Sequence, residues 1–117
     1  LEQRSMLRYP VETIQGRVKQ AAQEARVCLE QKARRFVVHF DVDVINFVDF
    51  PIADVPQFNS GLTFEEAMVC LSVFASSAYF GGLVITEFNP DHTDEDGVLT
   101  ATFVQGIVQA LAQDRQV

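Results

Sequence analysis

Residues 35–44 read Arg-Phe-Val-Val-His-Phe-Asp-Val-Asp-Val, and the rest of the chain is organised around them. The apolar run at 36–40 predicts a strand buried on both faces and interrupted only by His39. Side chains alternate along a strand, so Asp41 and Asp43 are expected on the same side, about 5–7 Å apart. Two carboxylates this close repel each other unless a cation or a shared proton lies between them. The stretch therefore predicts a divalent-metal site with oxygen ligands, and the open alternative is a pair that bonds to a loop or caps a helix.

The size and charge of the chain limit the classes of protein to consider. It has 117 residues, of which 48% are hydrophobic, enough for one globular domain and too few for two. Its net charge of −7 argues against nucleic acid and anionic membranes as partners. No apolar run reaches the roughly 18 residues that cross a bilayer, and no signal peptide is recognisable at the N-terminus. The chain begins with Leu1 rather than Met, which hints at a fragment boundary.

The helices are predicted from apolar spacing and from capping residues. Apolar positions recur every three or four residues over 11–33, where Gly16 weakens the helix or marks its start. Thr63 and Glu66 form a capping box that begins a second helix, which ends near residues 76–77. Thr100 is expected to cap a third helix over 101–112. The residues expected on its inward face are Phe103, Val104, Ile107, Val108 and Leu111.

A second apolar strand is predicted at 83–88, and Gly81-Gly82 before it are expected to interrupt regular secondary structure. Two strands joined by a helix imply a right-handed parallel βαβ unit with helices on both faces. Ligands bind at the carboxyl ends of such strands, where Asp41, Asp43 and Glu87 all fall. Two strands alone would leave two apolar edges open, so the chain is expected to be part of a larger sheet.

The remaining polar and reactive residues have plainer interpretations. The loop at 45–60 is long, and its apolar residues are expected to hold it down. His39 is predicted to be a core histidine bonded to backbone, and His92 to be a solvated turn residue; the alternatives are support of a metal ligand and proton transfer. Cys28 and Cys70 are predicted to be buried free thiols in a reducing, cytoplasmic compartment.

Four segments resemble the ureohydrolase family, which comprises arginase, agmatinase and formimidoylglutamase. They follow the family's order and spacing over residues 10–112: His-Phe-Asp-Val-Asp at 39–43, Ser-Gly-Leu-Thr-Phe-Glu-Glu-Ala at 60–67, Thr-Glu-Phe-Asn-Pro at 86–90, and Asp94 with Thr100 and Ala101. The resemblance implies that residues 1–117 are the C-terminal part of one α/β/α domain with a mainly parallel sheet. It also implies a cytoplasmic, homo-oligomeric enzyme that hydrolyses a linear C–N bond in a cationic guanidino or amidino substrate.

The resemblance assigns roles to the three acids. It implies that Asp41 and Asp43 bind two manganese ions, which activate a bridging water for attack on the substrate carbon. It implies that Glu87 is the catalytic and substrate-binding residue that pairs with the guanidinium. The family's other metal ligands, a histidine and an Asp-x-His-x-Asp motif, lie in its N-terminal part and have no counterpart here. We therefore expect the isolated chain to bind metal weakly and to be inactive.

Other classes of protein fit the sequence less well. The main alternative is a separated or degenerate half that serves as a structural or oligomerisation module without catalysis. A phosphoacceptor receiver domain needs a strand-end lysine near its acids, whereas Lys19 and Lys32 lie on the first predicted helix. Metal-dependent deacetylases share the wider fold, but their motifs match less closely.

Overall fold

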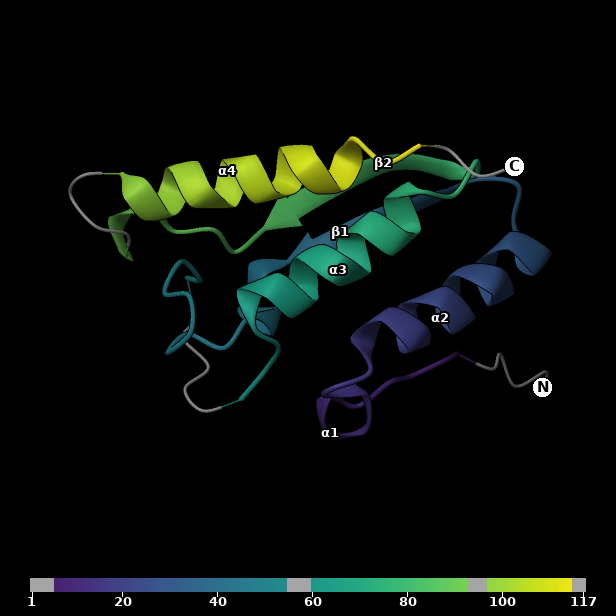
Figure 1. Ribbon diagram of the computed structural model, residues 1–117, viewed down its shortest axis with the longest axis horizontal. Helices are drawn as coiled ribbons and strands as arrows, with labels where there is room; N and C mark the ends of the chain where they lie inside the picture. Colours follow the sequence, from purple (N-terminus) through teal and green to yellow (C-terminus); the bar gives the residue numbers. More distant parts are fainter. Residues whose placement is uncertain (1–5, 55–59, 93–96, 115–117) are drawn as a thin grey trace, which may run out of the picture.

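The computed structural model describes residues 6–54, 60–92 and 97–114. Two parallel strands, β1 and β2, are joined by the helix α3, as the sequence predicts (Figure 1). The elements, in order, are α1 (Val11–Ile14), α2 (Val18–Lys32), β1 (Phe36–Asp41), the 3-10 helix η1 (Val42–Val44), α3 (Phe64–Ala75), β2 (Phe80–Thr86), the 3-10 helix η2 (Pro90–His92) and α4 (Val98–Leu111).

Local sequence signals explain where the first two long helices begin. The helix predicted over 11–33 is divided at Gly16, whose φ of 80° is left-handed, so α2 starts only at Val18. At α3 the predicted capping box is confirmed, because Thr63 Oγ1 accepts from the Glu66 N–H at 3.0 Å and Glu66 Oε1 accepts from the Thr63 N–H at 2.9 Å.

The start of α4 and that of β2 differ from the prediction. α4 begins two residues before Thr100, which is therefore not its cap; Gly97 occupies the N-cap position with a φ of 70°. β2 starts at Phe80 and includes Gly81 and Gly82, so the prediction that these glycines interrupt regular structure is wrong. A side chain at Gly81 would lie 2.9 Å from Cγ of Arg35, which explains why a glycine is used within this strand.

The helices cover one face of the sheet. Phe36 and Phe40 point to this face and are buried, whereas Val37 and Val84, on the opposite face, are 60% and 51% exposed. The expected burial of the strand on both faces is therefore wrong for the described chain. His39 lies on the exposed face, where its Nε2 is 2.8 Å from Thr86 Oγ1, so its prediction as a core residue bonded to backbone is also wrong.

The core lies between the sheet, α3, α4 and the loop that follows η1. Four residues of this loop are buried, as expected: Ile45, Phe50, Ile52 and Ala53. The predicted anchors Val55 and Phe58 lie outside the described residues. On α4 the buried residues are Phe103, Ile107 and Ala110, whereas Val104 and Val108 are exposed, contrary to the prediction.

Close contact with α3 explains which side of α4 faces inward. A Cβ at Gly106 would lie 2.7 Å from Phe64 Cζ and 3.0 Å from Met68 Sδ, so the two helices approach each other closely at this glycine. This contact turns the side of α4 that contains Phe103, Gly106 and Ala110 toward the core. In the described part of the chain, none of the helices is long and apolar enough to cross a membrane.

Candidate metal and substrate site

Three acidic residues lie at the carboxyl end of the two-stranded sheet. Asp41 is the last residue of β1 and Asp43 lies in η1, while Glu87 directly follows β2. The strands are in register at this end, because Asp41 is the Cα partner of Thr86, the residue before Glu87. The parallel topology therefore brings the sequence-predicted acids to one end of the fold, the end at which α/β proteins bind ligands.

Asp41 and Asp43 are joined by a short turn rather than by strand geometry. The strand ends at Asp41, so the alternation argument does not extend to Asp43. Instead, Asp41 Oδ1 accepts a hydrogen bond from the Asp43 N–H at 2.9 Å, which is the loop-bonding role that the sequence left open. A carboxylate has two oxygens and about four acceptor sites, so this bond leaves capacity for a cation.

The donor chemistry at this turn fits part of a metal site. Carboxylate oxygens suit Mn²⁺ and other hard divalent ions. An ion with octahedral coordination needs six ligand atoms in total. Asp41 is exposed and Asp43 half-buried. Among the residues that the structure describes, no group of three or more His, Cys, Asp or Glu side chains could hold a metal ion. The described chain thus contains two candidate ligands and lacks the rest of a coordination sphere.

Glu87 has an unusual backbone conformation. Its φ of 65° is left-handed, and within the described ranges it is the one residue other than glycine with a positive φ. This conformation costs a glutamate about 1–3 kcal/mol and persists only where the surroundings impose it. Such residues concentrate at active sites and ligand clamps. No sequence pattern indicates this conformation at Glu87, because Asn, Asp and His are the side chains enriched in the left-handed region.

The loop after η1 imposes this conformation. The Asp54 N–H donates to the Glu87 carbonyl oxygen at 2.7 Å, and the Asn89 N–H donates to that of Ile52 at 2.9 Å. These bonds flank an antiparallel bridge between Ala53 and Phe88. The loop therefore clamps the segment from the Glu87 carbonyl to the Asn89 N–H, while the Glu87 side chain remains exposed.

Side chains strengthen the same clamp. Asn89 Nδ2 donates to Asp54 Oδ1 at 2.9 Å. The Nδ1 atom of His92 lies 2.7 Å from the Ala53 carbonyl oxygen, and its ring packs edge-on against Phe47 with centroids 5.7 Å apart. His92 is exposed, as predicted for a turn residue. Its contact with the loop is a structural role that the sequence analysis missed, because no local signal links residues so far apart in the chain.

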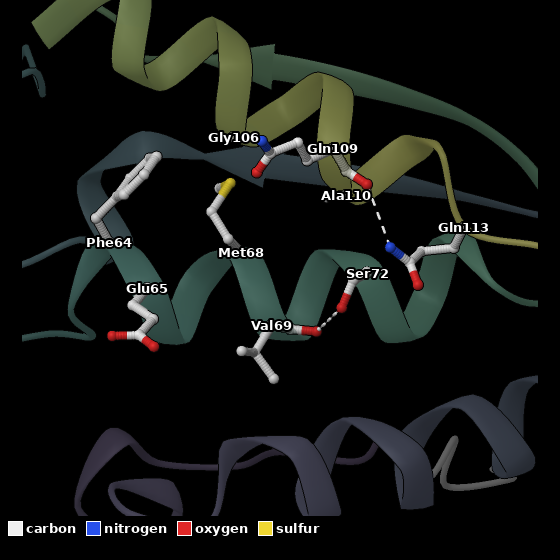
Figure 2. A pocket seen from close by; sticks show the side chains of 9 residues that line it. All are labelled: Phe64, Glu65, Met68, Val69, Ser72, Gly106, Gln109, Ala110 and Gln113. Carbon is white, nitrogen blue, oxygen red and sulfur yellow. Dashed lines mark hydrogen bonds between the residues drawn. The ribbon is translucent and has the colours of Figure 1, made fainter.

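A surface groove between two helices does not contain these acids. It has a volume of about 380 Å³ and lies between α3 and the C-terminal half of α4 (Figure 2). Figure 2 shows Phe64 and Met68 pointing toward α4, while Glu65, the acid of this lining, points away from it. A groove whose polar groups are mainly amides and a hydroxyl offers no acid–base pair, so the strand ends are the better candidate for chemistry.

The arrangement of helices and strands matches solved structures of the arginase group. The arginase of Bacillus caldovelox superposes with a TM-score of 0.77 at 17% identity, covering 93% of this chain and 36% of the arginase. The arginase of Entamoeba histolytica, in complex with L-ornithine, gives 0.71 at 19% identity, covering 86% and 33%. The formiminoglutamase of Trypanosoma cruzi with Mn²⁺ gives 0.65 at 17% identity, covering 88% and 35%.

These matches show the fold. The chain has an arginase-type α/β fold, as the sequence resemblance predicts, and it spans about a third of the length of the structures that it matches. No protein-family model and no curated protein sequence matches it.

Proposed function

We propose that this chain forms the C-terminal part of a metal-dependent hydrolase that cleaves a linear C–N bond in a guanidino or amidino substrate. The observation that carries the proposal is the position of Asp41, Asp43 and Glu87 at one end of an arginase-type sheet. The strained backbone of Glu87 supports it, because such strain concentrates at functional sites.

Each acid has a distinct role in this proposal. Asp41 and Asp43 contribute oxygen ligands to manganese, the metal present in the matched formiminoglutamase structure. Bound manganese ions supply Lewis acidity and lower the pKa of water toward neutrality. Glu87 presents an acceptor for the N–H groups of a planar cation, and bidentate pairing of this kind orients a guanidinium. The ornithine in the matched arginase complex is consistent with a small amino-acid-like ligand.

In this proposal, the other metal ligands come from the part of the fold that this chain does not contain. Two aspartates cannot complete two octahedral sites, so the 117-residue chain alone binds Mn²⁺ weakly and has no turnover. Further strands bring the other ligands to the same end of the sheet. The complete enzyme is a homo-oligomer, like the family that the sequence resembles.

The test uses the longer polypeptide that contains this chain, with urea or ammonia release measured over a panel of guanidino and amidino compounds. We expect Asp41→Asn and Asp43→Asn to abolish activity and to lower manganese occupancy. Glu87→Gln should abolish activity while occupancy remains unchanged. The control is Asp91→Asn, because Asp91 is an exposed acid of η2 near the same end and should have no effect.

Two results would contradict the proposal. Tight two-site manganese binding by the 117-residue chain alone would show that its metal site needs no further ligands. A longer polypeptide that folds but neither binds manganese nor releases product would favour the non-catalytic module, the alternative left open by the loop-bonding role of Asp41.

A further inference from the structure

Positive and negative charges are separated along this chain. Eight of the nine Lys and Arg residues lie within residues 1–35, whereas twelve of the 16 Asp and Glu residues lie beyond residue 35. The positively charged part includes α2, which packs against α3 at the edge of the helical layer (Figure 1). A small anion is therefore attracted to the α2 side of the molecule and repelled by the rest.

A polar cavity lies on the α2 side, between α2, the C-terminal part of α3 and the segment that follows α4. It has a volume of about 230 Å³. Its described lining consists of Lys19, Gln23, Arg26, Ser72, Val73, Ser76 and Gln113. Two of these side chains are cations, four are polar and uncharged, and none is an acid. Pockets for drug-sized ligands hold about 300–1,000 Å³, so this cavity suits a smaller molecule.

One side of α2 supplies the positive charge. Lys19, Gln23 and Arg26 are four and three residues apart, so they follow one another along the same side of the helix. Nη1 of Arg26 donates to Ser76 Oγ at 2.8 Å, and its Nε lies 3.8 Å from Oε2 of Glu30. These contacts fix the planar guanidinium against the end of α3. A fixed guanidinium beside an ammonium group is a common arrangement for binding phosphate.

Glu30 does not cancel this charge. Its Oε2 also accepts a hydrogen bond from Ser77 Oγ at 2.5 Å, and Ser77 is fully buried. Glu30 is not among the residues that line the cavity. Lys19 is exposed and has no ion pair with any residue that the structure describes. The cavity therefore keeps a net positive charge, and Lys19 is available to a ligand.

The wall formed by α3 combines covered carbonyl groups with acceptor oxygens. The C-terminal end of a helix carries partial negative charge, which repels an anion. Here the hydroxyls of Ser72 and Ser76 donate to the carbonyl oxygens of Val69 and Val73 at 2.7 Å each, which offsets part of that charge. Figure 2 shows the bond from Ser72 to Val69. Because its proton is used in this way, Ser72 Oγ presents lone pairs to the cavity.

We propose that this cavity, which we call the α2–α3 pocket, binds a phosphate group that retains one proton. Lys19 and Arg26 hold the charged oxygens, and the remaining P–OH group donates to Ser72 Oγ. Sulfate has the same tetrahedral shape and no proton near neutral pH, so it cannot make the bond to Ser72. Inorganic phosphate and a phosphate monoester share the proposed chemistry, and the experiment below distinguishes them.

The α2–α3 pocket is separate from the proposed hydrolytic site. The strands β1 and β2 are parallel, so α3, which connects them, runs in the opposite direction. Its C-terminal end with Ser72 and Ser76 therefore lies toward the amino end of the sheet, away from Asp41 and Glu87. The inference does not depend on the proposed catalysis. A phosphate that joins α2 to α3 binds only the folded chain, so it also stabilises this packing.

The experiment titrates the 117-residue chain with inorganic phosphate, methyl phosphate or sulfate at constant ionic strength. Calorimetry measures affinity, and amide NMR signals locate the ligand. At about pH 6 a phosphate monoester keeps its second proton in about half of the molecules. We expect inorganic phosphate to bind about tenfold more tightly than sulfate, because sulfate leaves Ser72 without its bond. Signals of residues 19–26 and 72–76 should shift. Methyl phosphate binding at least as tightly identifies a monoester site, and much weaker binding identifies a site for the free ion.

Three variants test the contacts, with circular dichroism to show that each is folded. Lys19→Gln should weaken phosphate binding about tenfold. Lys32→Gln is the matched control, because Lys32 is also an exposed lysine of α2 but does not line the pocket. It should leave the affinity unchanged. Ser72→Ala should remove the preference for phosphate over sulfate.

Three results would overturn the proposal. The first is that phosphate shifts no signals of the α2–α3 pocket. The second is that Lys19→Gln and Lys32→Gln weaken binding equally, because the attraction would then be general rather than local. The third is that sulfate binds the parent chain as tightly as inorganic phosphate does, because the P–OH bond to Ser72 would then contribute nothing.

Discussion

The backbone N–H of Asp54 donates a 2.7 Å hydrogen bond to the carbonyl oxygen of Glu87. This bond joins the loop that follows η1 to the residue directly after β2. Because Glu87 has a φ of 65°, the bond and the neighbouring Ala53–Phe88 bridge maintain a conformation that the glutamate would not adopt alone. The end of the sheet that contains the three acids is thus held by contacts between two loops as well as by the strands.

The strain at Glu87 makes a first prediction about stability. Glycine adopts this φ without a steric penalty, so Glu87→Gly should raise the free energy of unfolding by about 1 kcal/mol relative to Glu87→Ala, which retains the strain. Urea denaturation of both variants, with equal m-values, measures the difference. Equal midpoints for the two variants would show that the left-handed conformation is not strained, and would remove this support for the proposed site.

The capping box of α3 makes a second prediction. Thr63→Ala removes the acceptor for the Glu66 N–H and should lower the free energy of unfolding by about 1 kcal/mol. The matched control is Thr102→Ala on the exposed surface of α4, where the change should stay within about 0.5 kcal/mol because alanine favours a helix. Chemical denaturation of both variants checks this, and equal losses would mean that the cap contributes nothing specific.

Local signals explain which helix starts could be predicted. The capping box is a contact between residues three apart, so the sequence reveals it directly. The start of α4 was predicted too late because Gly97 fills the N-cap position without a side chain that would announce it. The predicted inward face of α4 is confirmed at Phe103 and Ile107 and wrong at Val104 and Val108. Its exact direction depends on the close approach of Gly106 to Phe64, a contact across 42 positions of the chain.

The candidate site was predicted in composition but not in detail. The position of acids at the carboxyl ends of parallel strands follows from topology, which the order of elements indicates. The turn between Asp41 and Asp43 and the left-handed Glu87 depend on loop contacts far apart in sequence. Val37 and Val84 are exposed because the described helices cover the other face of the sheet, and the apolar pattern of a strand does not reveal how many of its faces are covered.

The thiol of Cys70 makes a third prediction, about pH dependence. Burial and the nearby charge of Glu66 raise the pKa of Cys70 from 9.0 to about 11. The folded state therefore keeps a proton that the unfolded state loses, so this contribution to stability is present below pH 9 and is lost as the pH rises toward 11. In a Cys28→Ser background, the rate of alkylation of Cys70 should follow the thiolate, with a midpoint near pH 11.

The two causes of this pKa shift can be separated. Glu66→Gln removes the charge but retains the capping box, since glutamine can also accept the Thr63 N–H. Burial is the larger cause, so the midpoint in this variant should fall only slightly and remain above 9.0. A midpoint at the ordinary value in the Cys28→Ser chain would show that Cys70 is more solvated than its position between α2 and α3 implies.

Phe103 makes the last prediction, because it connects α4 to three other elements of the core. It is 5% exposed, and its ring centroid lies 5.2 Å from that of Phe88, 6.2 Å from that of Phe40 and 6.3 Å from that of Phe64. Phe103→Ala should therefore cost about 3–5 kcal/mol, a large part of the roughly 5–15 kcal/mol by which a domain is stable. Phe103→Leu retains most of the volume and should leave a folded protein whose loss in urea denaturation is smaller. Val104→Ala, one position further along α4, removes a side chain that is 52% exposed and should change the free energy of unfolding by less than about 0.5 kcal/mol. If Val104→Ala cost more than Phe103→Leu, the core would lie against the side of α4 that carries Val104 rather than the side that carries Phe103.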